Sequence, residues 1–487
     1  MIGDWISSTL NGPLIAAITG LVVMIAAIVV AVLRHKPKSE PKPPTEARKP
    51  RAEPGKPLPP PSPEPDAHAP DVQSLDDAET EALDAPSSYE MERMEERSTL
   101  DSPPLEKMEA EPRASAAPES APTIGSENSD HYAVTVHYGT DRRDSQSHDA
   151  QARFTDERAR PPRGASPITY GSCQVTIPKS HKVGGLEAPW WFDWSGEQTD
   201  KHVILQGLTT TDRDDFLRNL SQAMNDRKSA FVFVHGFSVS FEDAARRTAQ
   251  MAFDMKFPGA PIFFSWPTEI FGVTKPLAYS EAENNARWAT EHFRAFLADV
   301  IQKTGAETVH LIAHSMGNRV VADALMQLHW TLTPEEKAVI GEVILTAPDI
   351  DADVFVDQIA PRIQQMDARM TLYTSSEDEA LATSHTVHGY PRAGTFAALS
   401  HLPDGVDVID ASNVETGDHG HTYYGDSQSV MSDICHLMVS GLPANERALT
   451  LSSLTSPANQ TYWSVREATT IEQVWVALVD GGHTRNV

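Results

Sequence analysis

The sequence predicts an α/β fold in which helices flank a mostly parallel sheet, and three observations lead to this prediction. Short runs of β-branched and aliphatic residues alternate with helical patterns from about residue 229 to residue 440. One of these runs, VHLIA at 309–313, passes through a tight turn directly into the helical pattern GNRVVADAL. About 315 of the 487 residues follow a polar, proline-rich N-terminal region, and that length suits one large α/β domain.

Residues 1–36 are expected to form an N-terminal transmembrane anchor. Within them, PLIAAITGLVVMIAAIVVAVL at 13–33 is an uncharged apolar run of about the length that spans a bilayer. A cleavable signal peptide would need positive charge before this run, whereas here the basic residues follow it in RHKPKSEPK. The positive-inside rule then predicts a single-pass anchor in a bacterial inner membrane, with the rest of the chain in the cytoplasm.

Residues 37–130 are expected to be a disordered linker. The segment is rich in Pro, Glu, Ala and Ser and poor in aromatic residues. Such a composition cannot bury enough apolar surface to offset the entropy of ordering the chain.

Composition also excludes several kinds of function. The net charge of −28 argues against nucleic acid as a partner. The two cysteines, Cys173 and Cys435, are interpreted as buried or idle thiols rather than as a disulfide or a metal pair. The sequence has no CxxC, HExxH, P-loop or GxGxxG motif, so neither a metal nor another cofactor is predicted.

The globular domain is predicted to span residues 131–445. Three strands open it, at 132–142, 168–178 and 201–208, with a polar loop rich in Arg and Asp after the first. Strands and helices then alternate: strand 229–237, helix 240–255, strand 260–267, helix 280–305, strand 309–313, helix 317–325, strand 341–348, helix 354–365, strand 369–376, a short helix, and strand 405–412. Residues 446–487 form a C-terminal tail of unknown role.

A mostly parallel sheet carries its site at the carboxyl ends of its strands. About 20 residues separate strand 341–348 from strand 369–376, so no large lid domain is expected there. The apolar and aromatic loop WPTEIFGVTKPLAY at 266–279 is a candidate wall for a substrate. The alternative is a loop that packs on the end of the sheet.

Ser315 is the candidate nucleophile. Ala313-His314-Ser315-Met316-Gly317 is a G-x-S-x-G nucleophile elbow with Ala in place of the first Gly. The sharp strand-to-helix turn requires small residues such as Gly317 beside the serine, because the flanking backbones nearly touch. The turn lifts the hydroxyl above the sheet edge and directs the N-terminus of a helix at it.

The candidate acid is Asp378, because a triad on this elbow runs Ser, then Asp or Glu, then His in chain order. Asp378 stands in the acidic run EDE directly after strand 369–376. The alternative for this run is a solvated acidic cluster at a strand end. Asp349 and Asp351, one strand earlier, are the rivals, and both are interpreted as caps of the following helix.

The candidate base is His421, in the glycine-containing loop that follows strand 405–412. Such a loop can present an imidazole both to Ser315 and to Asp378. His419, two residues earlier in the same loop, is the alternative. His310 and His314 are interpreted as packing or local hydrogen-bonding residues.

An oxyanion hole is predicted from two backbone N–H groups, those of Met316 and Phe237. Met316 follows the nucleophile, and Phe237 follows the strand FVFV in the turn His235-Gly236-Phe237. Gly236 allows a close approach there, and His235 is expected to brace the loop. The alternative for His235 and Gly236 is an ordinary turn at a strand end.

These residues together resemble a bacterial family of α/β hydrolases of unknown function that are esterase- or lipase-like. The runs that carry the resemblance are FVFVHGFSVSFEDAARRTAQMAFDM, FSWP, HLIAHSMGNRV, APDIDADVF, LYTSSEDEAL and GHTYYGDS. The resemblance covers about residues 132–442 and implies the α/β-hydrolase fold, with Ser315, Asp378 and His421 in the triad roles. The family also contains exported members, so a periplasmic domain remains an alternative.

The predicted function is a serine hydrolase that cleaves a small-molecule or lipid-like carboxylic ester through an acyl-enzyme. A peptidase, thioesterase or acyltransferase on the same triad is an alternative, because the shape of the pocket decides the substrate. A membrane-tethered interaction protein without catalysis is another alternative. No oligomeric state is predicted.

Overall fold

The computed structural model describes residues 126–127, 130–188, 197–268, 275–366, 368–396, 399, 402–414 and 421–481. The predicted anchor at 1–36, nearly all of the predicted linker and His419 lie outside the described residues. Among the helices that the structure describes, none is long and apolar enough to cross a membrane. The anchor, its location in an inner membrane and the side on which the domain lies therefore stay predictions.

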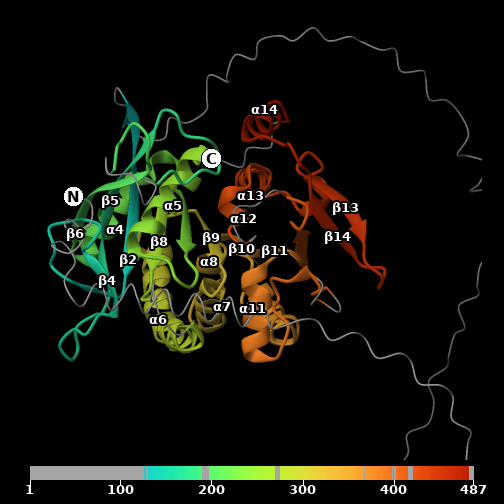
Figure 1. The fold of residues 1–487 in the computed structure, drawn as a ribbon, viewed down its shortest axis with the longest axis horizontal. Helices are drawn as coiled ribbons and strands as arrows, with labels where there is room; N and C mark the ends of the chain where they lie inside the picture. The colour runs from blue at the N-terminus through green and yellow to red at the C-terminus, as the bar shows by residue number, and fades with distance from the viewer. Residues whose placement is uncertain are drawn as a thin grey trace, which may run out of the picture. The chain divides into compact units, whose positions relative to one another are not determined.

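A 12-stranded sheet runs through the described domain (Figure 1). Its strands are β1 (Ser126–Glu127), β2 (His131–Thr140), β5 (Thr169–Pro178), β6 (Ile204–Thr211), β7 (Ser229–Val234), β8 (Ala260–Ser265), β9 (Thr308–His314), β10 (Ile340–Thr346), β11 (Arg369–Thr374), β12 (Val406–Asp410), β13 (Leu451–Thr455) and β14 (Thr461–Val465). Their order across the sheet is β13-β14-β12-β11-β10-β9-β7-β8-β2-β5-β6, with β1 paired to β2.

The sheet is mostly parallel, which confirms the predicted fold class. Every neighbouring pair from β2 through β8, β7, β9, β10, β11 and β12 to β14 is parallel. The antiparallel strands lie toward the margins, where β5 and β6 follow β2 and where β13 follows β14. The parallel strands thus bring the loops after β7, β9, β10, β11 and β12 to one edge of the sheet.

Three segments contain structure that the sequence pattern did not reveal, and helix α4 (Arg213–Ala223), between β6 and β7, is one of them. The polar loop after β2 contains the two-stranded pair β3 (Arg142–Asp144) and β4 (Phe154–Arg158). The tail beyond residue 445 joins the large sheet through β14 and ends in helix α14 (Ile471–Gly481), whose Trp475 is buried. The strands β3, β4, β13 and β14 are short, so their local periodicity is weak.

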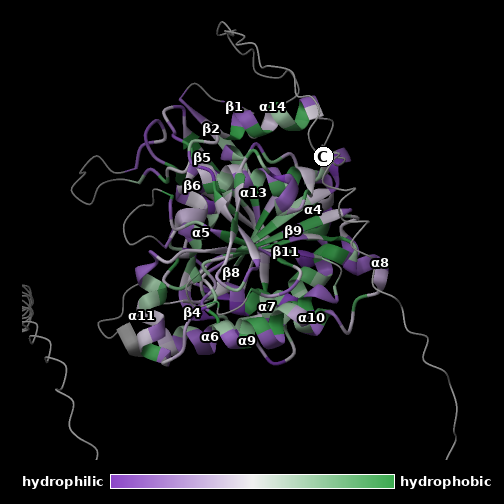
Figure 2. Ribbon diagram, turned by 90° about the vertical axis from the view of Figure 1, so that its right-hand side faces the viewer, coloured by the Kyte–Doolittle hydropathy of each residue, from purple (hydrophilic) through white to green (hydrophobic). Residues whose placement is uncertain are grey.

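Helices cover both faces of the sheet (Figure 2). One face carries α4 (Arg213–Ala223), α6 (Lys275–Lys303), α7 (Gly317–Leu328) and α10 (Ala360–Gln364), and the other carries α5 (Phe241–Asp254), α13 (Gln428–Ser440) and α14. The other α-helices of the described residues are α8 (Pro334–Lys337), α9 (Ala352–Val354), α11 (Glu379–His388) and α12 (Tyr423–Asp426). The predicted helices at 240–255, 280–305, 317–325 and 354–365 correspond to α5, α6, α7 and the run from α9 to α10.

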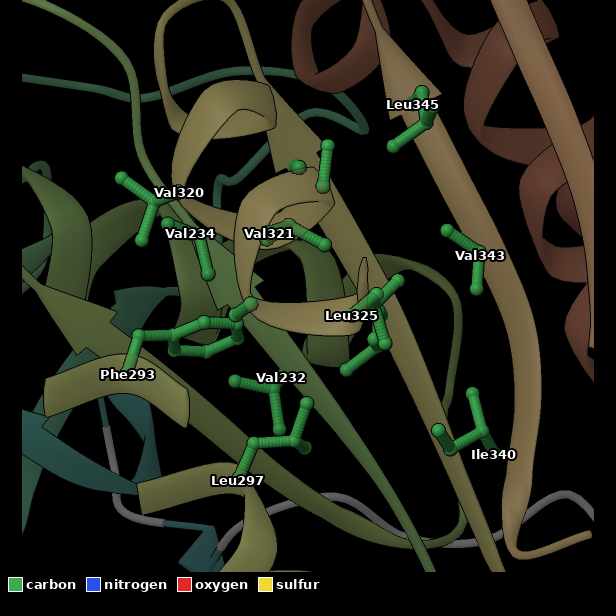
Figure 3. Packing of buried hydrophobic residues seen from close by; sticks show 14 of the residues in the cluster. Val232, Val234, Phe293, Leu297, Val320, Val321, Leu325, Ile340, Val343 and Leu345 are labelled. Carbon is green, nitrogen blue, oxygen red and sulfur yellow. The ribbon is translucent and has the colours of Figure 1, made fainter. Parts of the chain in front are cut away.

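The central strands are buried on both faces of the sheet. Their side chains alternate between two hydrophobic cores, one on each face. In β7, Val232 and Val234 pack into the cluster with α6 and α7, whereas Phe231 and Phe233 pack into the cluster with α5 and α13. Figure 3 shows the first cluster, with Phe293 and Leu297 of α6 and Val320, Val321 and Leu325 of α7 beside the strand residues. Each such side chain contributes about 1.5–3 kcal/mol when fully buried.

An ion cluster holds the loop after β5 against α5. The His181 ring lies between two carboxylates, with Nδ1 2.8 Å from Glu187 Oε2 and Nε2 2.8 Å from Asp254 Oδ1. Burial alone would lower the pKa of His181, but the hydrogen bonds to Asp254 and Glu187 outweigh it and raise this pKa to about 9. The cluster is therefore an ion pair network at neutral pH.

Candidate functional site

The backbone at Ser315 has the strained geometry of a nucleophile elbow. Ser315 stands between β9 and α7 with φ at +52°, in the left-handed region that costs a non-glycine residue of order 1–3 kcal/mol. A Cβ atom at Gly317 would lie 2.4 Å from the His235 carbonyl oxygen and 2.6 Å from that of Val234. The small residue that the motif requires is thus explained by the backbone of the neighbouring strand.

Asn318, which the sequence analysis did not single out, braces this elbow. Its side-chain amide donates to the carbonyl oxygens of Ser315, at 2.9 Å, and Thr346, at 3.0 Å. The Ser315 N–H also donates to the Thr346 carbonyl oxygen at 3.0 Å, which ties the turn to the end of β10. The elbow motif ends at Gly317, one residue before Asn318, so the motif itself does not predict a role for Asn318.

Asp378 and His421 meet, although 43 residues separate them in the chain. His421 Nδ1 lies 2.7 Å from Asp378 Oδ2, and the carboxylate side chain is fully buried while the imidazole is 19% exposed. The other carboxylate oxygen accepts the Leu381 N–H, so that Asp378 also caps α11. The alternative of a solvated acidic cluster is therefore wrong for Asp378, whereas its neighbours Glu377 and Glu379 are exposed.

His314, the residue before Ser315, makes a hydrogen bond to the backbone of His421. Its Nε2 lies 3.0 Å from the His421 carbonyl oxygen, which can only accept, so His314 carries its proton on Nε2. The two rings have their centroids 4.6 Å apart. Burial holds the pKa of His314 well below its ordinary value, so this ring stays neutral and serves as a local hydrogen-bonding residue, as expected.

Tyr423 fixes the start of α12, two residues after His421. Its hydroxyl donates to the Tyr373 carbonyl oxygen at 2.9 Å and accepts the Ala347 N–H at 3.0 Å. The segment that carries His421 is thus joined to the ends of β10 and β11. The sequence marked this tyrosine only as the start of an element.

The two rival aspartates have different roles from each other. Asp351 accepts the Val354 N–H and caps α9, as predicted. Asp349 was also expected to cap this helix, and that expectation is wrong. Its carboxylate is 2% exposed and lies 3.0 Å from Arg392 Nε and 2.6 Å from the Ser384 hydroxyl. Its side chain turns into this buried network because a cation and hydroxyl donors there solvate it.

The loop that follows β7 lies against the nucleophile. A Cβ atom at Gly236 would lie 2.8 Å from the Ser315 Cβ, so the glycine is what permits the approach. Among the described residues, neither the Phe237 N–H nor the Met316 N–H donates a hydrogen bond to a protein acceptor. Within the described part of the chain, both predicted oxyanion donors thus lack a protein acceptor.

The predicted loop at 266–279 is partly helical, since α6 begins at Lys275, and residues 269–274 lie outside the described residues. One aromatic residue stands on each side of them, Trp266 after β8 and Tyr279 in α6. Trp266 is buried and stacks on His235, with centroids 5.4 Å apart. Tyr279 packs against the half-buried Phe237, with centroids 5.6 Å apart. The start of α6 thus lies beside the predicted oxyanion donor, where a wall for a substrate would be needed.

In the part of the chain that the structure describes, no hydrogen bond joins the Ser315 hydroxyl to His421. Such catalytic hydrogen bonds are often long in ligand-free enzymes and tighten when substrate binds. The same part of the chain contains no cluster of His, Cys, Asp or Glu that could hold a metal ion. Cys173 and Cys435 are both buried free thiols, as interpreted from the sequence.

A cavity of about 510 Å³ lies away from these residues. It is lined by Arg369, Leu402, Pro403, Asp404, Gly405, Val406, Asp407, Pro443, Gln460, Thr461 and Trp463. Arg369, Val406 and Thr461 begin β11, β12 and β14, so the cavity lies at the amino ends of these strands. It contains none of the predicted catalytic residues.

Known proteins were compared with the chain by sequence and by structure. No curated protein matches the sequence. Carboxylesterase CesB (YbfK) from Bacillus subtilis is 10% identical, with 44% of this chain and 84% of that chain covered and a TM-score of 0.21. An extracellular α/β-hydrolase from a Paenibacillus species, described as sharing structural and functional homology with tobacco salicylic acid binding protein 2, is 14% identical, with 42% and 86% covered and a TM-score of 0.18.

A family model matches the central part of the chain. Residues 211–439, from the end of β6 to the end of α13, match the family described as alpha/beta hydrolase of unknown function (DUF900). The matched segment contains β7 to β12 and every residue of the predicted triad. Residues 211–439 of this chain are thus similar to the α/β hydrolases of this family.

Proposed function

We propose that this protein is a serine hydrolase that cleaves carboxylic esters, with Ser315 as nucleophile, His421 as general base and Asp378 as the residue that orients the base. The observation that carries the proposal is the 2.7 Å hydrogen bond between His421 Nδ1 and the buried Asp378 carboxylate, beside a serine with φ at +52°. A buried carboxylate on Nδ1 leaves Nε2 as the atom that takes a proton from Ser315 and gives it to the leaving alcohol.

The proposed reaction has two steps. Ser315 Oγ attacks the ester carbonyl while His421 Nε2 takes the hydroxyl proton, and the Phe237 and Met316 N–H groups bind the negative oxygen that forms. The carbon–oxygen bond to the alcohol then breaks, and His421 gives the proton to the leaving alcohol. Water attacks the resulting acyl-enzyme in the same way, which releases the carboxylic acid and restores Ser315.

Asp378 is suited to this role because it is held twice. One oxygen caps α11 and the other accepts from His421, so the carboxylate cannot rotate away without losing a hydrogen bond. The charge stabilises the imidazolium that forms when His421 takes the proton. The choice of a lipid-like ester rests on the predicted anchor alone. A peptidase, thioesterase or acyltransferase would use the same three residues, because the shape of the pocket decides the substrate.

The test is labelling of the full-length chain by a fluorophosphonate probe, together with hydrolysis of p-nitrophenyl butyrate. Wild type, Ser315→Ala, His421→Ala and His419→Ala are compared, with folding checked by circular dichroism. Labelling and turnover should be lost in the Ser315 and His421 variants and kept in the His419 variant. If folded wild-type protein takes no label, Ser315 is not an activated nucleophile and the proposal is wrong.

A further inference from the structure

We infer that Arg142 and Ser265 are positioning residues for the proposed oxyanion hole, and that they act through His235 to set the direction of the Phe237 N–H. This inference rests on the proposed function and adds to it two residues that the triad does not contain. Arg142 stands outside the segment that matches the family model, in β3.

Arg142 connects three parts of the chain although its side chain is fully buried. Its Nε donates to the Ser265 hydroxyl at the end of β8 at 2.8 Å, across 123 residues of sequence. Its Nη2 donates to the Val239 carbonyl oxygen at 2.6 Å, in the loop that follows β7. Its Nη1 lies 2.9 Å from Asp156 Oδ1, which balances the charge. Only the planar fork of an arginine reaches three such acceptors at once.

The Trp266 N–H fixes the protonation of His235. This backbone group can only donate, and it donates to His235 Nε2 at 3.2 Å. Nε2 therefore carries no proton, and the ring proton lies on Nδ1. Nδ1 then donates to the Gly236 carbonyl oxygen, which lies 2.9 Å away.

Ser265 joins Arg142 to the His235 ring, and the side chains of Arg142, Ser265 and His235 are called the relay below. Because its oxygen accepts the Arg142 Nε–H, its own hydrogen is free to point at His235 Nε2, 3.1 Å away. Burial lowers the pKa of His235 to about 3, and the positive charge of Arg142 lowers it as well. The ring is thus kept neutral with its only proton directed at Gly236.

The hydrogen bond from His235 to the Gly236 carbonyl also sets the direction of the Phe237 N–H, through the geometry of the peptide bond. The Gly236 carbonyl and the Phe237 N–H belong to one planar trans peptide, so they point in opposite directions. When the carbonyl is held toward the His235 ring, the Phe237 N–H must point away from it. The same peptide lies against the nucleophile, since a Cβ at Gly236 would be 2.8 Å from the Ser315 Cβ.

The backbone of His235 is held as well, so the relay acts on a fixed ring. Trp266 Nε1 donates to the His235 carbonyl oxygen at 2.8 Å, and the two rings stack with an angle of 5° between their planes. Removing the Ser265 hydroxyl therefore changes what holds the imidazole without removing the loop itself.

The experiment compares full-length wild type with Ser265→Ala, with Arg142→Lys as a second variant. Thr140→Val is the matched control, because Thr140 is as buried as Ser265. Its hydroxyl donates to the Ser265 carbonyl oxygen and accepts the Arg142 backbone N–H, so it contacts the main chain of these residues and not their side chains. Kinetics are measured with p-nitrophenyl butyrate. Inhibition is measured with an alkyl trifluoromethyl ketone, whose addition to Ser315 creates a negative oxygen in the oxyanion hole.

We expect Ser265→Ala to lower kcat about 10- to 100-fold, less than the loss of a complete oxyanion donor, with KM changed less than about 2-fold. The affinity for the trifluoromethyl ketone should fall by the same factor as kcat/KM, which a role in folding alone would not produce. Arg142→Lys should act in the same direction, because a lysine keeps the charge and loses the fork. Thr140→Val should lower stability without moving either kinetic quantity.

A folded Ser265→Ala variant with unchanged kcat and unchanged inhibitor affinity would overturn the inference and leave the proposed function intact. Equal kinetic losses in Ser265→Ala and Thr140→Val would overturn it too, since any buried hydroxyl would then matter. If wild type neither hydrolyses the ester nor takes the fluorophosphonate label, the proposed function itself fails, and the inference fails with it.

Discussion

Replacing Gly236 by alanine tests whether the loop after β7 serves the nucleophile. The added Cβ would lie 2.8 Å from the Ser315 Cβ, 3.0 Å from His314 Nδ1 and 3.1 Å from the His314 carbonyl oxygen. The φ of Gly236 lies outside the left-handed region, so the backbone conformation itself allows an alanine. Any effect must therefore come from the contact.

The size of the effect follows from these distances. Carbon atoms in contact prefer a separation of about 3.5–4.0 Å, so the loop and the elbow would have to separate by about 1 Å. A misplacement of about 1 Å in a catalytic site can cost about 100-fold in rate, which corresponds to about 2.7 kcal/mol of transition-state stabilisation. Overpacking should also lower the free energy of unfolding by about 1–3 kcal/mol.

The assay is kcat and KM for p-nitrophenyl butyrate, with urea unfolding of the same samples. Gly207→Ala in β6 is the matched control, because its Cβ would meet no atom within 4 Å. That variant should keep the wild-type rate and stability. A Gly236→Ala variant with a kcat within about 3-fold of wild type would refute the reasoning, because the Phe237 N–H would then not depend on the close approach.

Three further predictions follow from the contacts. Asp378→Asn keeps a cap for α11 but removes the charge beside His421, so kcat should fall about 10³- to 10⁴-fold while the free energy of unfolding changes by less than about 1 kcal/mol; enzyme kinetics and urea unfolding measure the two. The pKa of His181 is raised from 6.5 to about 9, so its ion cluster stabilises fully below pH 6.5 and loses this contribution as the pH rises through 9. Wild type should lose about 3 kcal/mol over that range in urea unfolding and His181→Gln should not; parallel pH profiles would contradict the assignment. Arg392→Met removes the closest cation of the buried Asp349 and leaves Arg319 Nη2, 3.5 Å from the carboxylate, as the other cation, so the free energy of unfolding should fall by about 1–3 kcal/mol; an unchanged urea midpoint would contradict the ion pair.

The elements that could be predicted from the sequence are those with a strong local period. An uninterrupted apolar run predicts strand β7, and apolar residues at helical spacing directly after it predict helix α5. The hairpin of β3 and β4 could not be predicted in this way, because its strands are polar and short. The same holds for β13 and β14, which become part of the domain only because β12 offers them an edge.

In the candidate site too, residues of a local motif could be predicted from the sequence, whereas contacts between distant residues could not. Ser315 and Gly317 belong to one turn, so five consecutive residues were enough to single them out. Asp349 was assigned to a helix cap because a cap is a local feature, whereas its actual partner Arg392 is 43 positions away in the sequence. No local signal distinguishes an aspartate that caps a helix from one that turns into a buried network.

By itself, the sequence determined the central alternation of strands and helices from β7 to β12 and the residues that stand where these strands end, because both depend on neighbours within a few positions. The tertiary structure decided which of these residues meet. His421 reaches Asp378, Gly236 lies against Ser315, and Arg142 reaches Ser265 only when the strands have taken their order in the sheet. The physical reason is that such contacts depend on the packing of the whole domain, whereas a turn or a period depends on the chain alone.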